Sequence, residues 1–549
     1  MAENQSGPGE FRFEEAEDGA SELTSSHAIH HHAFPMSIMN EHRRTLLILF
    51  FDILEERRLR EIEIAKQELE RCRNDRAAIL AEESPARTSE ESSSVAALSQ
   101  LSQESWEPSA KRLCFEPSYP EVPEMDDTSS PTKGNESEDA LNSSQQSYSS
   151  TSSSYVYSTV SNEALDDLRH RVARNMDILE PEYSTMRAGF GTFESGYSNH
   201  TCCFSHLTHF ARVTEGITQY AQAFPVATLK YDTSCSSYHS SVSSLEFSPA
   251  NTSLFSVADI SRSIQVFDLK NVIEEPDDYQ YPLARMECTA KISCVAWSPQ
   301  TAAILVNSEY DGSVVVWDIT KPRKLRKYTE HERRCCSVCF ARDEDNICAT
   351  GSNDCSVKIW NLNMANSAMT IRSHFIVCTV DFGFSRHEIA VGSADRSVYL
   401  YDLRQPVRPV SIFTGHRQAV SYVRYLNSYE IVSASTDNHL RLWNTVAGTC
   451  TRVLVGHRNT NNLVGLSVCG DHILTGSEDN RVYLYHKEAS RPLMLYDVDT
   501  CSSFPYGTDS SFDFENESED FVSAVAWRPD SNVILVGNSV GKVLVAELH

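Results

Sequence analysis

The chain has 549 residues, and its 48 Lys and Arg against 76 Asp and Glu give a formal net charge of −28. This balance argues against nucleic-acid binding, because a phosphate backbone rewards clustered cations. The longest apolar run, Leu46 to Phe51, is too short to span a bilayer, and no secretory signal pattern opens the sequence. The adjacent thiols Cys335 and Cys336, among 16 cysteines, suit a reducing compartment. We expect a protein of the nucleus and cytoplasm without nucleic-acid or membrane partners.

The N-terminal part predicts a disordered segment followed by one long helix. Residues 1–40 are acidic and rich in Ser and His, whereas residues 41–83 contain no Pro or Gly and are dominated by helix formers. Apolar positions in the second half of this helix follow three-four spacing: Ile62, Ala65, Leu69, Cys72 and Ile79. Arg76 interrupts one position of the seam. The pattern favours a coiled coil, with itself or with a partner, over a solvated single helix, which has little packing to hold it.

The next two segments connect this helix to the C-terminal part. Residues 84–160 are rich in Ser, Glu and Pro, a composition that predicts a disordered linker because it buries too little apolar surface. Residues 161–228 contain two stretches with apolar residues at helical spacing. We expect a helical segment there that packs against the C-terminal part.

A repeat fixes the predicted fold of residues 229–549. From residue 242 onward, an apolar strand, a small-residue strand, an Asp turn and a strand ending in an aromatic recur. The aromatic positions are Phe267, Trp317, Trp360, Tyr401, Trp443 and Tyr485, and Val545 closes the series. Four consecutive gaps of 43, 41, 42 and 42 residues match the length of a WD40 blade. The sequence therefore predicts a mainly β fold, a seven-bladed WD40 propeller, with ATLKY near residue 229 supplying the strand that closes the ring.

Three blades share a set of polar residues at matched offsets. The sets are His331, Ser352, Asp354 and Trp360; His416, Ser435, Asp437 and Trp443; and His457, Ser477, Asp479 and Tyr485. An Asp in a tight turn can accept from the imidazole, which in turn meets the Ser hydroxyl and ties the strands together. A hydrolase triad uses the same residue types, but recurrence in successive blades indicates a structural role. We predict no catalytic residue.

At this point the sequence resembles a known family, the constitutively photomorphogenic (COP1) ubiquitin ligases and their SPA-type partners. GHRQAVSYVRYLNSYEIVSASTDNHLRLWN and FVSAVAWRPDSNVILVGNSVGKVLV resemble blades of that family, QAFPVATLKY resembles the strand that leads into its propeller, and LLILFFDILEERRLREIEIAKQELERC resembles its coiled coil. The resemblance implies a propeller that binds peptides with a Val-Pro core and acidic flanks. It also implies that transcription factors or adaptors carrying such peptides are presented for ubiquitination and proteasomal degradation.

The resemblance also implies a peptide-binding site. The positions that agree with the family are Lys291, Tyr310, Arg334 and Phe521. The two cations would hold carboxylates of the ligand, while the two aromatic side chains would form the walls of the Val-Pro slot.

Three positions depart from the family. Cys336 stands where the family has Trp, and Asn461 and Leu463 stand where it has Lys and Phe. Losing an aromatic anchor or a cation costs on the order of 2 kcal/mol each at a peptide hot spot, which puts Val-Pro specificity in doubt.

The expected biochemical role depends on the metal ligands that residues 1–160 contain. A RING finger needs eight Cys or His ligands for two zinc ions, whereas this part has only Cys72 and Cys114 as cysteines. We therefore expect no metal and no cofactor. We expect a non-catalytic substrate-recognition subunit that works with a RING-bearing ligase subunit and with a cullin adaptor. The alternatives are a divergent or truncated ligase of the same family, and a generic WD40 scaffold.

Three further signals are weighed. Val122, Pro123 and Glu124 form a Val-Pro motif with acidic flanks, hypothesised to occupy the propeller face of the same chain or of a dimer mate and to compete with clients. Chance is the stronger interpretation, because about one or two Val-Pro dipeptides are expected in a chain of this length. A cluster of His and Cys at 200–209 lacks a Cys-x2-Cys pair, which argues against zinc. The kinase-like DFG at 381–383 falls on the predicted first strand of a blade, and no H-R-D catalytic loop accompanies it.

Overall fold

The computed structural model describes residues 40–82, 162–188, 200–231, 240–276, 279–462, 464–505 and 520–549. The predicted N-terminal disordered segment, apart from Asn40, and the predicted linker lie outside these residues, and so do Cys114 and Leu463. The Val122 hypothesis also concerns residues outside them.

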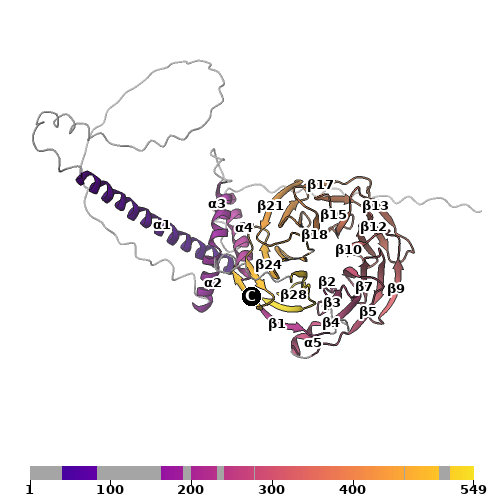
Figure 1. Cartoon of the computed structure of the whole chain (residues 1–549). Helices are drawn as coiled ribbons and strands as arrows, with labels where there is room; N and C mark the ends of the chain where they lie inside the picture. Colours follow the sequence, from indigo (N-terminus) through magenta and orange to yellow (C-terminus); the bar gives the residue numbers. More distant parts are fainter. Residues whose placement is uncertain are drawn as a thin grey trace, which may run out of the picture.

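Seven antiparallel sheets stand around a central channel, which confirms the predicted seven-bladed propeller (Figure 1). Blade 1 comprises β2 (Val242–Phe247), β3 (Leu254–Asp259), β4 (Ser263–Asp268) and β5 (Ala284–Glu287); blade 2 comprises β6 (Ile292–Trp297), β7 (Ile304–Glu309), β8 (Val314–Asp318) and β9 (Arg323–Tyr328). Blade 3 comprises β10 (Cys335–Phe340), β11 (Ile347–Ser352), β12 (Ser356–Asn361) and β13 (Met369–Arg372). The first strand of each blade lines the channel, and the last lies at the rim.

The remaining blades follow the same order. Blade 4 comprises β14 (Val377–Phe382), β15 (Glu388–Ser393), β16 (Ser397–Asp402) and β17 (Ser411–Thr414); blade 5 comprises β18 (Val420–Asn427), β19 (Glu430–Ser435), β20 (His439–Asn444) and β21 (Thr449–Val455). Blade 6 has five strands: β22 (Leu466–Cys469), β23 (His472–Gly476), β24 (Arg481–His486), β25 (Met494–Asp497) and β26 (Ser502–Pro505). Asp381 of the DFG sequence lies on β14, the first strand of its blade, as expected.

The last blade is closed by a strand from the other end of the propeller. It comprises β27 (Val522–Trp527), β28 (Val533–Asn538) and β29 (Val543–Leu548), and its fourth strand is β1 (Ala223–Leu229), antiparallel to β29. The strand begins six residues before the predicted boundary at 229. Ala223, Ala227 and Leu229 are buried while Phe224 is exposed, so the apolar pattern of a strand already starts upstream.

Apolar side chains fill the gaps between neighbouring blades. One cluster joins Leu229 of β1 and Val545 of β29 to Leu245 and Phe255 of blade 1, so it links the closing blade with the first. Another places Tyr328 of β9 against Trp360 of β12, with ring centroids 4.5 Å apart. Burying one such apolar side chain is worth about 1.5–3 kcal/mol, so contact between blades stabilises the ring throughout.

The predicted polar sets form in blades 3 and 5, with a different hydroxyl. Nδ1 of His331 lies 2.7 Å from Oδ2 of Asp354, but its Nε2 lies 2.8 Å from Thr350 Oγ1, not near Ser352. The indole of Trp360 donates to the same Thr350 hydroxyl at 2.8 Å. In blade 5 His416 meets Asp437 and Ser433, and Trp443 donates to Ser433, so the prediction for Ser435 was wrong in the same way.

Blade 6 does not form the predicted set. Tyr485 stands where blades 3 and 5 have Trp360 and Trp443, and its hydroxyl lies 3.1 Å from His457 Nδ1. Asp479 instead accepts from the hydroxyl of Tyr483 at 2.6 Å. Ser477 donates to the carbonyl of Arg458 at 3.1 Å. The predicted link from His457 to Asp479 is therefore replaced by two tyrosine contacts.

Five helices accompany the propeller in the part of the chain that the structure describes. They are α1 (Glu41–Glu82), α2 (Asn162–Arg174), α3 (Met176–Ala188), α4 (His200–Gln219) and the short α5 (Leu269–Glu274) of blade 1. Phe50 of α1, Leu179 of α3 and Phe210 of α4 pack with Leu493 of blade 6 in one apolar cluster. Helices α1 to α4 thus form a small domain attached to the side of the ring (Figure 1). Among the described helices, none is long and apolar enough to cross a membrane.

The second half of α1 leaves this cluster. The helix projects away from the disc, and Ile62 and Leu69 of the predicted seam are 51% and 52% exposed (Figure 1). Leu59 and Ile64 are exposed as well. Apolar residues on a solvated helix fit the predicted coiled coil, which stays a prediction because the structure contains one chain.

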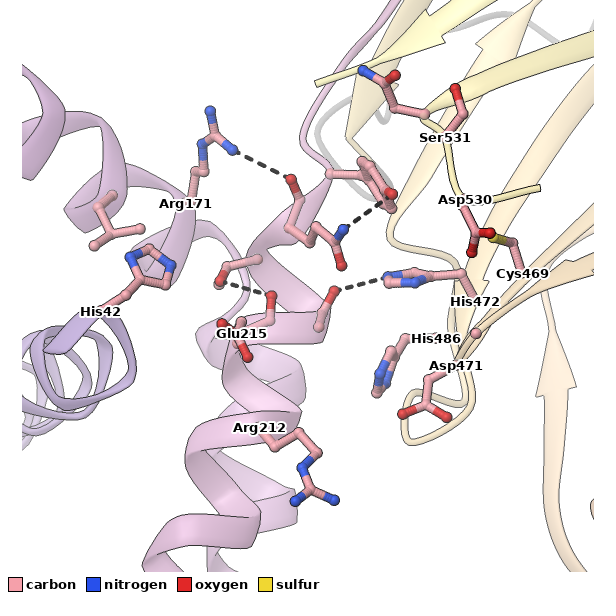
Figure 2. A pocket seen from close by; sticks show the side chains of 17 residues that line it. His42, Arg171, Arg212, Glu215, Cys469, Asp471, His472, His486, Asp530 and Ser531 are labelled. Carbon is pink, nitrogen blue, oxygen red and sulfur yellow. Dashed lines mark hydrogen bonds between the residues drawn. The ribbon is translucent and has the colours of Figure 1, made fainter. Parts of the chain in front are cut away.

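Helix α4 lies very close to blade 6. The carbonyl of Gly216 accepts a hydrogen bond from Nε2 of His472 at 2.9 Å, and His486 lies beside it (Figure 2). A Cβ at position 216 would stand 2.5 Å from His486 Nε2, so any larger residue would require the buried His486 ring to move. Both imidazoles are buried, and burial lowers their pKa, that of His486 to about 3.

Candidate functional site

The first strands of the blades share an irregularity at one face of the ring. In six of the seven blades, the register shifts by one residue directly after the first residue of the strand. The bulged residues are Ser243, Ser293, Cys336, Cys378, Ser421 and Ser523. Since each is small, the mouth of the channel at this face stays open.

The opening is a cavity of about 350 Å³ that collects most of the predicted site residues. Tyr310, Arg334, Cys336, Asn461 and Phe521 all line it, although they come from three blades and the loop before β22. The backbone carbonyl of Lys291 accepts from the N–H of Tyr310 at 2.9 Å, while the lysine is exposed and outside the lining. Leu463 is not among the described residues.

Arg334 and Tyr310 form a stacked pair at the edge of the cavity. The guanidinium carbon lies 3.8 Å from the centroid of the tyrosine ring. Nε of the arginine is buried and has no hydrogen-bond partner among the described residues, so this N–H is left unsatisfied. An arginine held flat on an aromatic ring is pre-organised to bind a carboxylate.

Ser352 of the predicted blade set holds this arginine in place. Its hydroxyl donates to the carbonyls of Arg333 at 3.2 Å and Arg334 at 3.0 Å. The N–H of Asn353 donates to the Arg334 carbonyl at 2.9 Å. The serine therefore fixes the loop that carries the site, and its hydroxyl accepts from the N–H of Asp354 at 3.1 Å instead of contacting the His331 imidazole.

The charge at the cavity is positive. Among the described residues that line it, Arg334 is the one with a charged side chain, and no carboxylate is present. The other polar groups are hydroxyls, thiols and amides, which carry no charge. An anionic group entering the cavity therefore meets a cation and no repulsion.

Three thiols line the cavity, those of Cys294, Cys336 and Cys378. Burial raises the pKa of Cys336, and it raises the pKa of Cys378 to about 12. Sγ of Cys336 lies 3.0 Å from Oδ1 of Asn353. Thiols with a raised pKa stay protonated near neutral pH and are poor nucleophiles. Within the described ranges, no group of three His, Cys, Asp or Glu is arranged to hold a metal ion.

Sequence reasoning missed part of the lining. Asn353, Cys378 and Tyr422 reach the cavity, and burial raises the pKa of the Tyr422 hydroxyl to about 12. A signal was present for Cys378: an apolar residue followed by Ser or Cys opens most first strands, as in Val377 and Cys378. That pair recurs in most blades and marks the bulged position.

The seven blades, the closing strand β1 and the polar networks that recur in blades 3 and 5 together define a WD40-repeat propeller protein. The family model described as WD domain, G-beta repeat matches residues 281–318, 322–361, 366–402, 407–444 and 448–486.

Comparison with similar proteins narrows the family to which the chain is assigned. The chain is 39% identical over 357 residues to E3 ubiquitin-protein ligase COP1 of Arabidopsis thaliana, covering 64% of this chain and 50% of that protein. It is 40% identical over 319 residues to Protein SUPPRESSOR OF PHYA-105 1 of the same organism, covering 56% of this chain and 30% of that protein. WD repeat-containing protein RUP2, also from Arabidopsis thaliana, is 32% identical over 332 residues, covering 55% of this chain and 87% of that protein.

The chain belongs to the COP1/SPA family of WD40-repeat proteins. It spans about half the length of the COP1 relatives that it matches.

Proposed function

We propose that this chain is a substrate-recognition subunit of a COP1-type ubiquitin ligase. In this role the propeller binds acidic Val-Pro peptides of transcription factors or adaptors and promotes their ubiquitination. The observation that carries the proposal is the stacked pair of Arg334 and Tyr310 at a cavity whose described lining contains no carboxylate.

The cavity suits the two parts of such a ligand. Arg334 would bind a carboxylate of the ligand, and the rings of Tyr310 and Phe521 would contact the Val-Pro core. Lys291 would meet a second carboxylate at the rim. Cys336 and Asn461 make this cavity less aromatic and less cationic than the family pattern, so we expect weaker binding of family ligands.

The proposed assembly needs other subunits. A RING-bearing ligase subunit, together with a cullin adaptor, would supply the ubiquitin-charged E2, while the exposed seam of α1 would pair with a helix of a second chain. The nucleus and cytoplasm are the proposed compartments.

The test is a binding measurement with a charge-reversed variant. We expect a fluorescent acidic Val-Pro peptide to bind the full chain, and Arg334→Glu to weaken it by at least tenfold, because a buried carboxylate then meets a like charge. Arg417→Glu is the control, since Arg417 is exposed in the loop before β18 and outside the cavity lining. Equal affinity of wild type and Arg334→Glu would overturn the proposal.

The relatives named E3 ubiquitin-protein ligase favour a second candidate, in which this chain is itself the ligase. Purified chain with E1 and a panel of E2 enzymes separates the two. Ubiquitin transfer that needs an added RING subunit supports the recognition role, whereas transfer without one supports the ligase.

A further inference from the structure

The rim of blade 2 carries an unusual concentration of positive charge. β9 contains Arg323, Lys324, Arg326 and Lys327 among its six residues, and Lys321 precedes it. All but the partly buried Arg326 are exposed. The strand lies at the outer edge of the ring (Figure 1). Such a strip stands out in a chain whose formal net charge is −28.

Protection of an edge strand does not account for this charge. Natural sheets place lysines on edges to prevent pairing with other strands. The corresponding rim strands of blades 3 and 4 contain no lysine: β13 has one basic residue, Arg372, and β17 has none. The register of β9 against β8 also shifts at Leu325, and this bulge already makes the edge a poor template for strand addition.

Part of the positive charge is uncompensated. Arg323 lies 3.5 Å from Asp318, and Lys327 lies 3.8 Å from Asp311. No described carboxylate comes within ion-pair distance of Lys324 or Arg326. Nζ of Lys324 lies 5.1 Å from the centroid of Trp317, and the Arg326 guanidinium donates to the carbonyl of Met364.

The C-terminal end of β9 lies near the turn that follows Tyr310, on the side of blade 2 that faces the cavity mouth. Nζ of Lys327, near the end of β9, donates to Thr289 Oγ1 at 3.0 Å and lies near Asp311, the residue after Tyr310. Tyr310 in turn carries Arg334 on its ring. A chain bound at the cavity that leaves it over blade 2 therefore meets the cations of β9.

We propose that β9 is a second part of the ligand site, which binds an acidic extended segment flanking the peptide anchored at the cavity. The proposal rests on the proposed function and names the chemistry of the flank: several Asp or Glu residues beyond the reach of Arg334. Lys324 pairs in register with Trp317, and Arg326 pairs with Val316. Since Val316 and Trp317 are neighbours on β8 and point to opposite faces of the sheet, Lys324 and Arg326 also lie on opposite faces. The contact depends on side-chain charge and not on backbone pairing.

The experiment compares two peptides that share a Val-Pro core. One carries a long flank of Asp and Glu, and the other carries Asn and Gln at the same positions. Lys324→Gln combined with Arg326→Gln should weaken the acidic peptide roughly three- to tenfold, as two solvated ion pairs would. The amide peptide should bind this variant and wild type equally, and the difference should shrink in high salt.

Arg372→Gln combined with Arg408→Gln is the matched control, since both arginines are exposed at rims of neighbouring blades. An unchanged affinity of the β9 variant for the acidic peptide, or an equal loss in the control, would overturn the inference. A single-stranded oligonucleotide is the third probe. If it loses affinity for the β9 variant while the acidic peptide does not, the strip binds nucleic acid and the inference is wrong.

The same measurements keep the two proposals apart. Binding of the amide peptide that depends on Arg334 supports the cavity alone. If binding of the acidic peptide depends on β9 but not on Arg334, the inference about β9 is supported and the proposed function is wrong.

Discussion

The guanidinium of Arg334 rests on the ring of Tyr310, with 3.8 Å between the guanidinium carbon and the ring centroid, although the two residues belong to different blades. The arginine precedes the first strand of blade 3, and the tyrosine follows the second strand of blade 2. The pair therefore exists only when the two blades are side by side, so the recognition site depends on the assembled ring.

The ring of Tyr310 should be needed for ligand binding, and its hydroxyl should not. Tyr310→Ala removes both a wall of the cavity and the surface on which Arg334 is held, with a stacking contribution of about 0.5–2 kcal/mol. We expect peptide affinity to fall about tenfold or more, whereas Tyr310→Phe should stay within about twofold of wild type. Isothermal titration calorimetry measures both, and an intact Tyr310→Ala affinity would contradict the stacked arrangement.

Thr350 and Ser352 should have different roles, although they lie two residues apart. Thr350→Val leaves the buried His331 Nε2 and Trp360 Nε1 without a partner, and we expect the free energy of unfolding to fall by about 1–3 kcal/mol. Ser352→Ala should chiefly loosen the loop of Arg334 and weaken peptide binding. Denaturant unfolding and peptide titration of both variants check this, and a larger stability loss for Ser352→Ala would reverse the assignment.

Gly216 should be required for the docking of α4 onto blade 6. Alanine favours a helix over glycine by about 1 kcal/mol, so Gly216→Ala should stabilise a free helix. Here its Cβ would stand 2.5 Å from His486 Nε2, and we expect lower thermal stability and faster hydrogen exchange in α4 instead. Arg212→Ala on the exposed side of the same helix is the control. A more stable Gly216→Ala protein would refute the close approach.

Acidification should loosen the same contact. Burial lowers the pKa of His486 to about 3 and also lowers that of His472, so the unfolded chain binds protons first as pH falls below about 6.5. The stability held by the neutral imidazoles is complete above that value and declines as pH drops toward the lowered pKa. The charged groups around His486 are Asp471, Lys487 and Arg452.

Thermal unfolding between pH 7.5 and pH 5 measures this effect. We expect a falling midpoint for wild type and a shallower fall for His486→Asn, which has no group to protonate at that site. Equal slopes for the two proteins would show that other groups dominate.

The blade period was readable from the sequence because each blade repeats its own chemistry every 41 to 43 residues across four consecutive gaps. The partner of the imidazole was not readable. Thr350 and Ser352 are two apart on one strand and so share a face, and the pattern does not say which hydroxyl the imidazole reaches. The prediction for blade 6 was wrong for another reason: the hydroxyl of Tyr485 contacts the His457 imidazole directly.

The site was predictable in part. The resemblance placed Tyr310, Arg334, Cys336, Asn461 and Phe521 at a common site, and the structure brings them to one cavity. Lys291 differs because its backbone, not its side chain, contacts Tyr310. Cys378, which the prediction missed, occupies a bulged position. The recurring pair of an apolar residue and Ser or Cys marks that position in the sequence, but the bulge itself is a property of two paired strands and could be recognised only with their register.

The antiparallel pairing of β1 with β29 has a practical consequence for dividing this protein. A fragment that starts at Val242 would contain every strand of the other six blades, yet its final sheet would expose Val543 and Val545 along a bare edge. Such a fragment is expected to aggregate, whereas a fragment that starts upstream of Ala223 keeps β1 and with it the strand that covers this edge. A boundary between α4 and β1 therefore keeps the closing strand, whereas a boundary at Val242 removes it.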